Sequence, residues 1–232
     1  MGSQSISPGV VVARIWEIYR DQFLVLFGTA VILYALQFVI LLVLSGGSAI
    51  FLSVLFWVLS VIYQGMVVKL VQDVQDGRRD SSIADLLGSV SHVLWALLAV
   101  SILFGIGVAI GFVLLIIPGL YLLVVWSVVA PVTVLEHPGV FAAFRRSRHL
   151  VRGNGWQVFG VIVIVFLAVA VASIAVGIVA SGFGSAGRAL VQWAVNALLA
   201  PVSALSASVI YFALLGQHGG EPVTHDPASP TL

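Results

Sequence analysis

Long apolar stretches separated by short polar segments dominate this sequence of 232 residues. Residues 22–68 contain no charged side chain, and neither do residues 93–135. A helix of 47 residues would be about 70 Å long at about 1.5 Å per residue, whereas the hydrocarbon core of a bilayer is about 30 Å thick. Each stretch is therefore expected to fold back on itself and cross a membrane twice.

Glycine, serine and proline mark the positions where the stretches fold back. The first stretch is interrupted by SGGS at 45–48, the second by IIPGL at 116–120 and a third by SGFGSAG at 181–187. Proline lacks a backbone donor and glycine tolerates a turn, so a helix is expected to end at such segments. Six spans are predicted, with Pro201 bending the last: 23–44, 49–70, 93–115, 119–135, 156–180 and 189–214.

Composition supports a membrane protein built from helices. The chain is 61% hydrophobic and 8% charged, whereas a soluble domain carries about 25% charged residues. A membrane barrel would show alternating segments of about ten residues, but these runs are continuously apolar. The predicted fold class is therefore all-α: a polytopic integral membrane helical bundle of three hairpins, each preceded by a cytoplasmic interfacial segment.

A repeat supports the division into hairpins. Residues 7–28 (SPGVVVARIWEIYRDQFLVLFG) and 137–160 (HPGVFAAFRRSRHLVRGNGWQVFG) both open on Pro-Gly-Val and place an arginine eight residues before the glycine of a Phe-Gly pair. Residues 81–100 form a fainter copy, and such a period dictates architecture. We predict one transmembrane domain, 1–215, with hairpin repeats at about 7–72, 81–136 and 137–215. The Gly/Pro/Ser-rich tail, 216–232, is predicted to be disordered.

The distribution of basic residues predicts an orientation. Basic residues in short loops stay on the cytoplasmic side during membrane insertion. Six spans place nine of the ten basic residues on one side: Arg14, Arg20, Lys69, Arg78, Arg79, Arg145, Arg146, Arg148 and Arg152. Arg188 falls on the other side. Both termini are therefore expected to be cytoplasmic.

Arginines cluster between the fourth and fifth spans, at Arg145, Arg146, Arg148 and Arg152. On a helix, four basic residues share one face: Arg145, Arg148, His149 and Arg152. Apolar residues lie towards the other face: Val140, Phe141, Phe144 and Val151. Such a helix is expected to lie in the membrane interface, with its apolar face in the acyl boundary and its arginines towards the headgroups.

The N-terminal segment is expected to occupy the same interface. It carries Arg14 and Arg20, a possible pair of Arg14 with Glu17, and the aromatic residues Trp16 and Tyr19, which suit the level of the headgroups. Trp156, at the start of the fifth span, is likewise expected to lie at the level of the headgroups. These residues and the arginine cluster are the candidate headgroup contacts. The cluster sets topology, or it also recognises a lipid headgroup or an acidic cytosolic partner.

Few residues suggest chemistry inside the membrane. The central parts of the spans lack ionisable groups, which argues against a proton relay, an ion-coupled pump or an acid–base enzyme. Cysteine is absent and the five histidines lack the spacing of a metal site, so no metal or cofactor is expected. Gln64, Gln192 and Asn196 could line an intramembrane polar site, although such residues more often hydrogen-bond between helices.

Small residues in the spans are expected to let helices approach closely. They are Ser101, Gly105 and Ala109 with Gly107 and Gly111 in the third span, and Ser173 with Gly177 in the fifth.

Residues 116–164 resemble the membrane domain attached to some bacterial glycerophosphoryl diester phosphodiesterases, and related stand-alone six-span proteins of unknown function. The matching features are Ile117-Pro118-Gly119, Glu136, AAFRRSRHLVRG at 142–153 and the aromatic-Gly pair that opens the fifth span. The resemblance implies a fold and a place in the bacterial cytoplasmic membrane. It implies no catalytic residues, because the catalytic barrel of those hydrolases is a separate domain.

These observations predict a non-enzymatic polytopic protein that organises membrane lipids, chiefly anionic ones, or protein partners, and does not bind nucleic acid. The alternative is a facilitative transporter or lipid-handling protein with a path between the hairpins near Gln64, Gln192 and Asn196. A cavity lined by those amides favours the alternative, and a solid bundle favours the scaffold.

Overall fold

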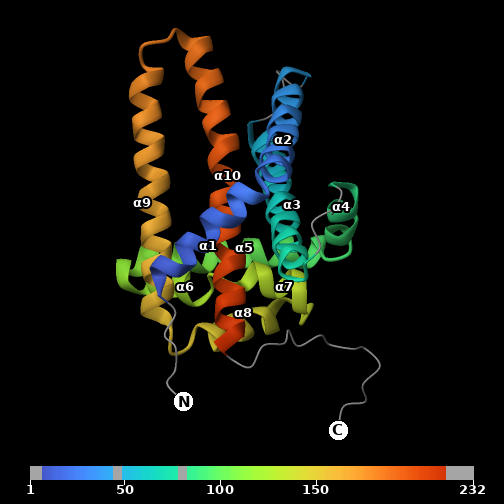
Figure 1. Ribbon diagram of the computed structural model, residues 1–232, viewed down its shortest axis with the longest axis vertical. Coiled ribbons are helices and arrows are strands. Elements are labelled where there is room, and N and C mark those ends of the chain that lie inside the picture. Colours follow the sequence, from blue (N-terminus) through green and yellow to red (C-terminus); the bar gives the residue numbers. More distant parts are fainter. Residues whose placement is uncertain (1–6, 44–48, 78–82, 218–232) are drawn as a thin grey trace.

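The computed structural model describes residues 7–43, 49–77 and 83–217, which are almost entirely helical and contain no strand (Figure 1). The helices are α1 (Pro8–Asp21), α2 (Phe23–Val43), α3 (Ala49–Gln75), α4 (Ile83–Ser91), α5 (Leu94–Leu114), α6 (Ile116–Val125), α7 (Val129–Glu136), α8 (Val140–Val151), α9 (Gly155–Ala180) and α10 (Ser185–Gln217). The predicted turn at 45–48 and residues 218–232 of the predicted tail lie outside the described residues.

The predicted fold class is confirmed. Five of the described helical segments are long and apolar enough to cross a membrane, and a sixth is added if α1 and α2 count as one bent span. α2, α3, α5, α9 and α10 coincide with predicted spans to within a few residues. The chain is a multi-pass membrane protein whose regular structure is all α-helix.

The hairpins do not all run in the same direction. Figure 1 shows α2, α3, α9 and α10 along the long axis of the molecule, whereas α5, α6 and α8 run across it near one end. The chain also bends by 77° between α1 and α2. The middle hairpin therefore lies crosswise to the other two, a difference of direction that hydropathy does not encode.

The fourth predicted span, 119–135, lies within Ile116–Glu136, one of the five segments that could cross a membrane, and a turn interrupts its helix. Its residues belong to α6 and α7, which are separated by a turn at 126–128. Pro131 has no N–H to donate to the carbonyl of Ser127, and proline is tolerated in the first turn of a helix. Pro118 likewise lies in the first turn of α6, while the reversal itself takes place at the extended residue Leu115.

Two glycines bring α5 and α6 into close contact. A Cβ added to Gly111 would lie 2.9 Å from the Cα of Gly119, and one added to Gly107 would lie 2.4 Å from the ring of Trp126. By contrast, a Cβ on Gly105 or Gly177 would meet no heavy atom within 4 Å. Of the predicted small-residue contacts, those of Gly107 and Gly111 are therefore confirmed, and those of Gly105 and Gly177 are wrong.

Each short helix packs on a hairpin from another part of the chain. α4 packs on α3, and α8 packs on α5, α6 and α7, so each follows and contacts the preceding hairpin. α1 packs on α9 and α10. The hairpins are thus joined in a closed ring, and the buried core lies where the short helices meet them.

Much of the remaining surface is apolar. Only three residues of α9 are buried, Val158, Val161 and Ala180, although the helix is apolar throughout. Contiguous apolar surface of this extent is not tolerated in water. At about 1.5 Å per residue, the 26 residues of α9 span about 39 Å, which is enough to cross the hydrocarbon core.

The contact between α5 and α6 predicts different effects of alanine at two glycines. Gly111→Ala presses a methyl group against the Gly119 backbone, and overpacking of about 1–3 kcal/mol exceeds the gain of about 1 kcal/mol from replacing glycine in a helix. Gly105→Ala meets open space and is expected to be neutral or stabilising. Unfolding by titration with sodium dodecyl sulfate measures both. Equal stability of the two variants would contradict the described packing.

Candidate functional site

The basic residues of α8 lie on its exposed face. Arg145, Arg148, His149 and Arg152 are all exposed, as the helical spacing predicts. The opposite face is buried against protein: Ala143, Ser147, Leu150 and Val151. This corrects the expectation that the apolar face lies in the acyl boundary, because α5, α6, α7 and α10 cover it. Phe141 is 75% exposed, so its predicted contact with acyl chains stays a prediction.

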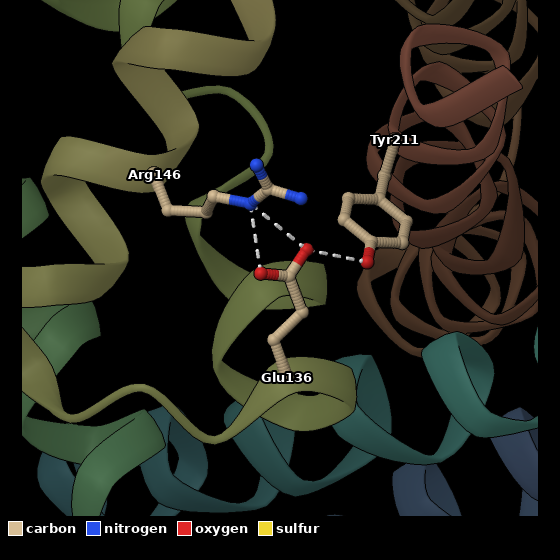
Figure 2. Close-up of polar contacts among 3 residues, drawn as sticks. All are labelled: Glu136, Arg146 and Tyr211. Atoms are coloured by element: carbon tan, nitrogen blue, oxygen red, sulfur yellow. Dashed lines mark hydrogen bonds and ion pairs between the residues drawn. The ribbon is translucent and has the colours of Figure 1, made fainter. Parts of the chain in front are cut away.

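A buried polar cluster holds α8 in place (Figure 2). The carboxylate of Glu136, which is 2% exposed, lies between the side chains of Arg146 and Tyr211. Arg146 Nε donates to Glu136 Oε2 at 2.8 Å and to Oε1 at 3.2 Å. The Tyr211 hydroxyl donates to Oε1 at 2.8 Å. The cluster therefore links the end of α7, the middle of α8 and the last part of α10.

A tight turn brings Glu136 and Arg146 together. His137, at a φ of 51°, and Gly139, at a φ of 83°, reverse the chain between α7 and α8. Arg146 is then one residue, or about 100° of helix, away from Arg145 and points inward. Its side chain is 23% exposed. A buried carboxylate is costly unless it is paired and hydrogen-bonded, and both conditions hold here.

Sequence reasoning grouped Arg146 with the surface arginines and did not find its partner. Two signals were present. Arg146 does not share the face of Arg145, Arg148 and Arg152, and Glu136 is the only acidic residue between Asp85 and Glu221. An isolated acidic residue beside a basic cluster, at the end of an apolar stretch, is a candidate for a buried pair.

A further buried contact also fixes α8. The hydroxyl of Ser147 donates to the carbonyl of Val125 at 2.9 Å. Phe144 contacts the ring of Trp126 edge to face, with centroids 4.9 Å apart. Both contacts reach the turn between α6 and α7, where backbone groups are released from helical bonding. The broken span and the anchored α8 are therefore parts of one arrangement.

The histidine that precedes α8, His137, adds no charge to the exposed face of that helix. Desolvation by the surrounding protein and, less strongly, the charge of Lys69 lower the pKa of His137, although the residue as a whole stays exposed. Its ring is therefore neutral at pH 7 and adds nothing to the cationic face.

The N-terminal candidates divide into exposed and buried residues. Arg20 and Trp16 are exposed, and Arg14 pairs with Glu17 at 2.6 Å as the spacing predicts. Tyr19 is 7% exposed and donates to the carbonyl of Leu198 at 3.1 Å. This corrects its proposed headgroup position, because the packing of α1 on α10 encloses the ring. Trp156, at the start of α9, is 84% exposed.

The proposed intramembrane site does not assemble. Gln192 and Asn196 are exposed and hydrogen-bond each other along α10 at 3.2 Å. Gln64 lines two other cavities, of about 290 and 340 Å³, and neither amide of α10 borders them. The grouping of Gln64 with Gln192 and Asn196 is therefore wrong.

Different polar residues line the spaces between the hairpins. Ser60 and Gln64 border both of these cavities. Ser127 borders the second of them and a further cavity of about 280 Å³, and Ser203 borders the first and this further one. The Ser127 hydroxyl is buried and has no hydrogen-bond partner among the described residues. Neighbouring cavities with hydroxyl and amide groups thus lie where the hairpins meet.

No group of three histidine, cysteine, aspartate or glutamate side chains that could hold a metal ion occurs in the part of the chain that the structure describes.

The buried cluster predicts a large effect of removing Arg146. Arg146→Ala leaves the Glu136 carboxylate buried without its cation and is expected to cost about 3–5 kcal/mol of unfolding free energy. Tyr211→Phe removes one hydrogen bond and is expected to cost about 1 kcal/mol. The matched control, Arg145→Ala on the exposed face, is expected to change stability by less than about 0.5 kcal/mol. Equal losses for Arg145→Ala and Arg146→Ala in detergent unfolding would rule out a stabilising pair.

Comparison with known proteins supports a membrane protein of bacterial type. The chain is 34% identical over 95 residues to a UPF0259 membrane protein of Pectobacterium carotovorum subsp. carotovorum (strain PC1). The match covers 41% of this chain and 38% of the length of that relative. No family model matches the chain, and no solved structure is significantly similar to it. The narrower resemblance to the membrane domain of glycerophosphoryl diester phosphodiesterases stays a prediction.

Proposed function

We propose that the protein is a non-enzymatic scaffold that gathers anionic lipids at the cytoplasmic leaflet of a bacterial inner membrane. The observation that carries this proposal is the orientation of α8. A buried ion pair turns Arg146 inward, while Arg145, Arg148 and Arg152 face outward from a helix that is anchored to the bundle. Each arginine near an anionic leaflet contributes about 1 kcal/mol, so the three outward arginines favour anionic lipids over zwitterionic ones.

The arrangement of the hairpins supports a cytoplasmic position for this face. The start of α1, the end of α3, α8 and the end of α10 lie towards one end of the molecule, and the turn between α9 and α10 lies at the other (Figure 1). The first end carries most of the basic residues, and the second carries Arg188. Under the rule that basic loops stay inside, the first end is cytoplasmic. The crosswise α5–α6 hairpin begins and ends at this same end of the molecule, so it does not change the orientation.

The crosswise hairpin is suited to the same leaflet. Its tip is apolar and exposed over residues 113–117. If α9 and α10 cross the bilayer, α5 and α6 lie along its plane, beside α8 and close to the headgroups. There the hairpin contacts acyl chains below a layer of arginines.

The burial and the hydrogen bonds of Glu136 support a non-enzymatic role. Among the described residues it is the only charged side chain that is buried. Its carboxylate already accepts hydrogen bonds from Arg146 and Tyr211. A carboxylate that is occupied in this way stabilises the fold and is poorly placed to act as a general base.

The scaffold proposal predicts enrichment of anionic lipid around the protein. Polymer discs that excise the protein with its native lipids are expected to hold a higher ratio of phosphatidylglycerol to phosphatidylethanolamine than discs from the bulk membrane. Replacing Arg145, Arg148 and Arg152 by glutamine should lower the ratio, and Arg188→Gln, at the opposite end, should not. Mass spectrometry of the lipids measures it. A wild-type ratio equal to that of the bulk membrane would disprove the proposal.

The cavities between the hairpins favour a second candidate, a facilitative path for an apolar or zwitterionic molecule. Because the chain has no cysteine, single-cysteine variants can test it without background. Ser127→Cys and Ser203→Cys line the cavities, whereas Ala197→Cys is buried away from them. A continuous path predicts that a charged methanethiosulfonate reagent modifies the first two and not the third. Protection of all three sites would reject this candidate.

A further inference from the structure

A cavity of about 480 Å³ lies beside the end of α8. Arg148 of α8 and Arg152, which directly follows the last residue of α8, line it together with Tyr121 of α6. Val125 and Val151 form an apolar part of its wall, and the glycines at 153 and 155 complete it. Arg145, which is exposed on the same helix, does not border it. The cationic face of α8 is therefore not uniform, because two of its arginines surround a space and the third does not.

The local backbone keeps this space open. Gly153, at a φ of +91°, turns the chain from α8 into α9, which begins at Gly155. A Cβ added to either glycine would meet no heavy atom within 4 Å. The corner thus leaves room directly beside Arg148 and Arg152. These two residues are one helical turn apart and line the same cavity.

The charge in this corner is not balanced by the described part of the protein. Arg148 and Arg152 have no acidic partner among the described residues, and the nearby carboxylate of Glu136 is already paired with Arg146. Like charges four residues apart on a helix repel each other. An anion placed between the two guanidinium groups removes this repulsion. The first-turn amides of α9 add to the positive potential, since Asn154 supplies no side-chain cap.

We propose that this corner is a specific site for the phosphate diester of one glycerophospholipid. This proposal rests on the proposed function and gives one of the gathered lipids a defined position. Guanidinium groups bind phosphate oxygens through paired hydrogen bonds, and the partly exposed Tyr121 supplies a hydroxyl donor. The exposed apolar surface of α9 begins at the same corner with Trp156 and runs away from it. The acyl chains of a lipid whose phosphate binds in the corner can pack against this surface. A free phosphate has no acyl chains and makes no such contact.

Titration of the full chain in a neutral detergent with dioctanoyl phosphatidylglycerol tests the site. Native mass spectrometry is expected to show one lipid bound more tightly than the rest. The variant with Arg148→Gln and Arg152→Gln should bind this lipid at least about tenfold more weakly. The matched control, Arg188→Gln at the opposite end of the molecule, should bind within about twofold of the wild type, because it loses a charge that does not border the cavity. Equal weakening by both changes would overturn the specific site.

A filling variant keeps the test valid if the double arginine variant does not fold. Gly155→Leu occupies the cavity without removing a charge, and Gly177→Leu adds the same side chain to open space farther along α9. Loss of the tight lipid in Gly155→Leu alone is expected. Retention of the tight lipid in Gly155→Leu would overturn the proposal.

Inorganic phosphate distinguishes the two sources of the anion. A site for a lipid phosphate is expected to bind inorganic phosphate much more weakly than the short-chain lipid, because the acyl contacts are missing. Equal affinity for the two probes would overturn the lipid assignment. The lipid ratio in the polymer discs separates this proposal from the scaffold: enrichment without a single tight lipid refutes only the site.

Discussion

The pairing of a buried carboxylate with an arginine is the interaction on which the arginine-rich layer around α8 depends. Glu136 ends the broken fourth apolar segment in a place from which water is excluded, and its charge is tolerated because Arg146 and Tyr211 surround it. This requirement orients α8, since Arg146 must face inward. The remaining arginines then face outward as a consequence of helical geometry. One interaction thus anchors the helix and also decides which of its arginines face outward.

The ring of helix contacts places this layer relative to the hairpins. Two hairpins run along the molecule, the third crosses them, and each short helix covers the hairpin of a different repeat. Tyr19 illustrates the last of these contacts, because its hydroxyl donates a hydrogen bond to Leu198 of α10, 179 residues further along the chain. In such a ring no hairpin needs a polar core of its own. The interiors stay apolar, and polar groups gather where hairpins and short helices meet, as they do around Ser127.

The sequence predicted much of the fold and less of the site. Spans follow from hydropathy, and the exposed face of α8 follows from the spacing of Arg145, Arg148 and Arg152. The direction of α5 and α6, the burial of Tyr19 and the separation of Gln64 from Gln192 could not be predicted in this way, because they depend on which hairpins contact each other. Pro131 could have predicted the turn at 126–128. The isolation of Glu136, in a long stretch without other acidic residues, could have predicted the buried pair.

Hydrogen–deuterium exchange of α8 in lipid discs tests the central claim most directly. If the Glu136 cluster anchors α8, amides 143–151 exchange slowly in the wild type, and Glu136→Gln speeds their exchange while the amides of α9 remain protected. Rapid exchange of α8 in the wild type, or equal protection in the two proteins, would contradict the claim that this buried pair positions the helix.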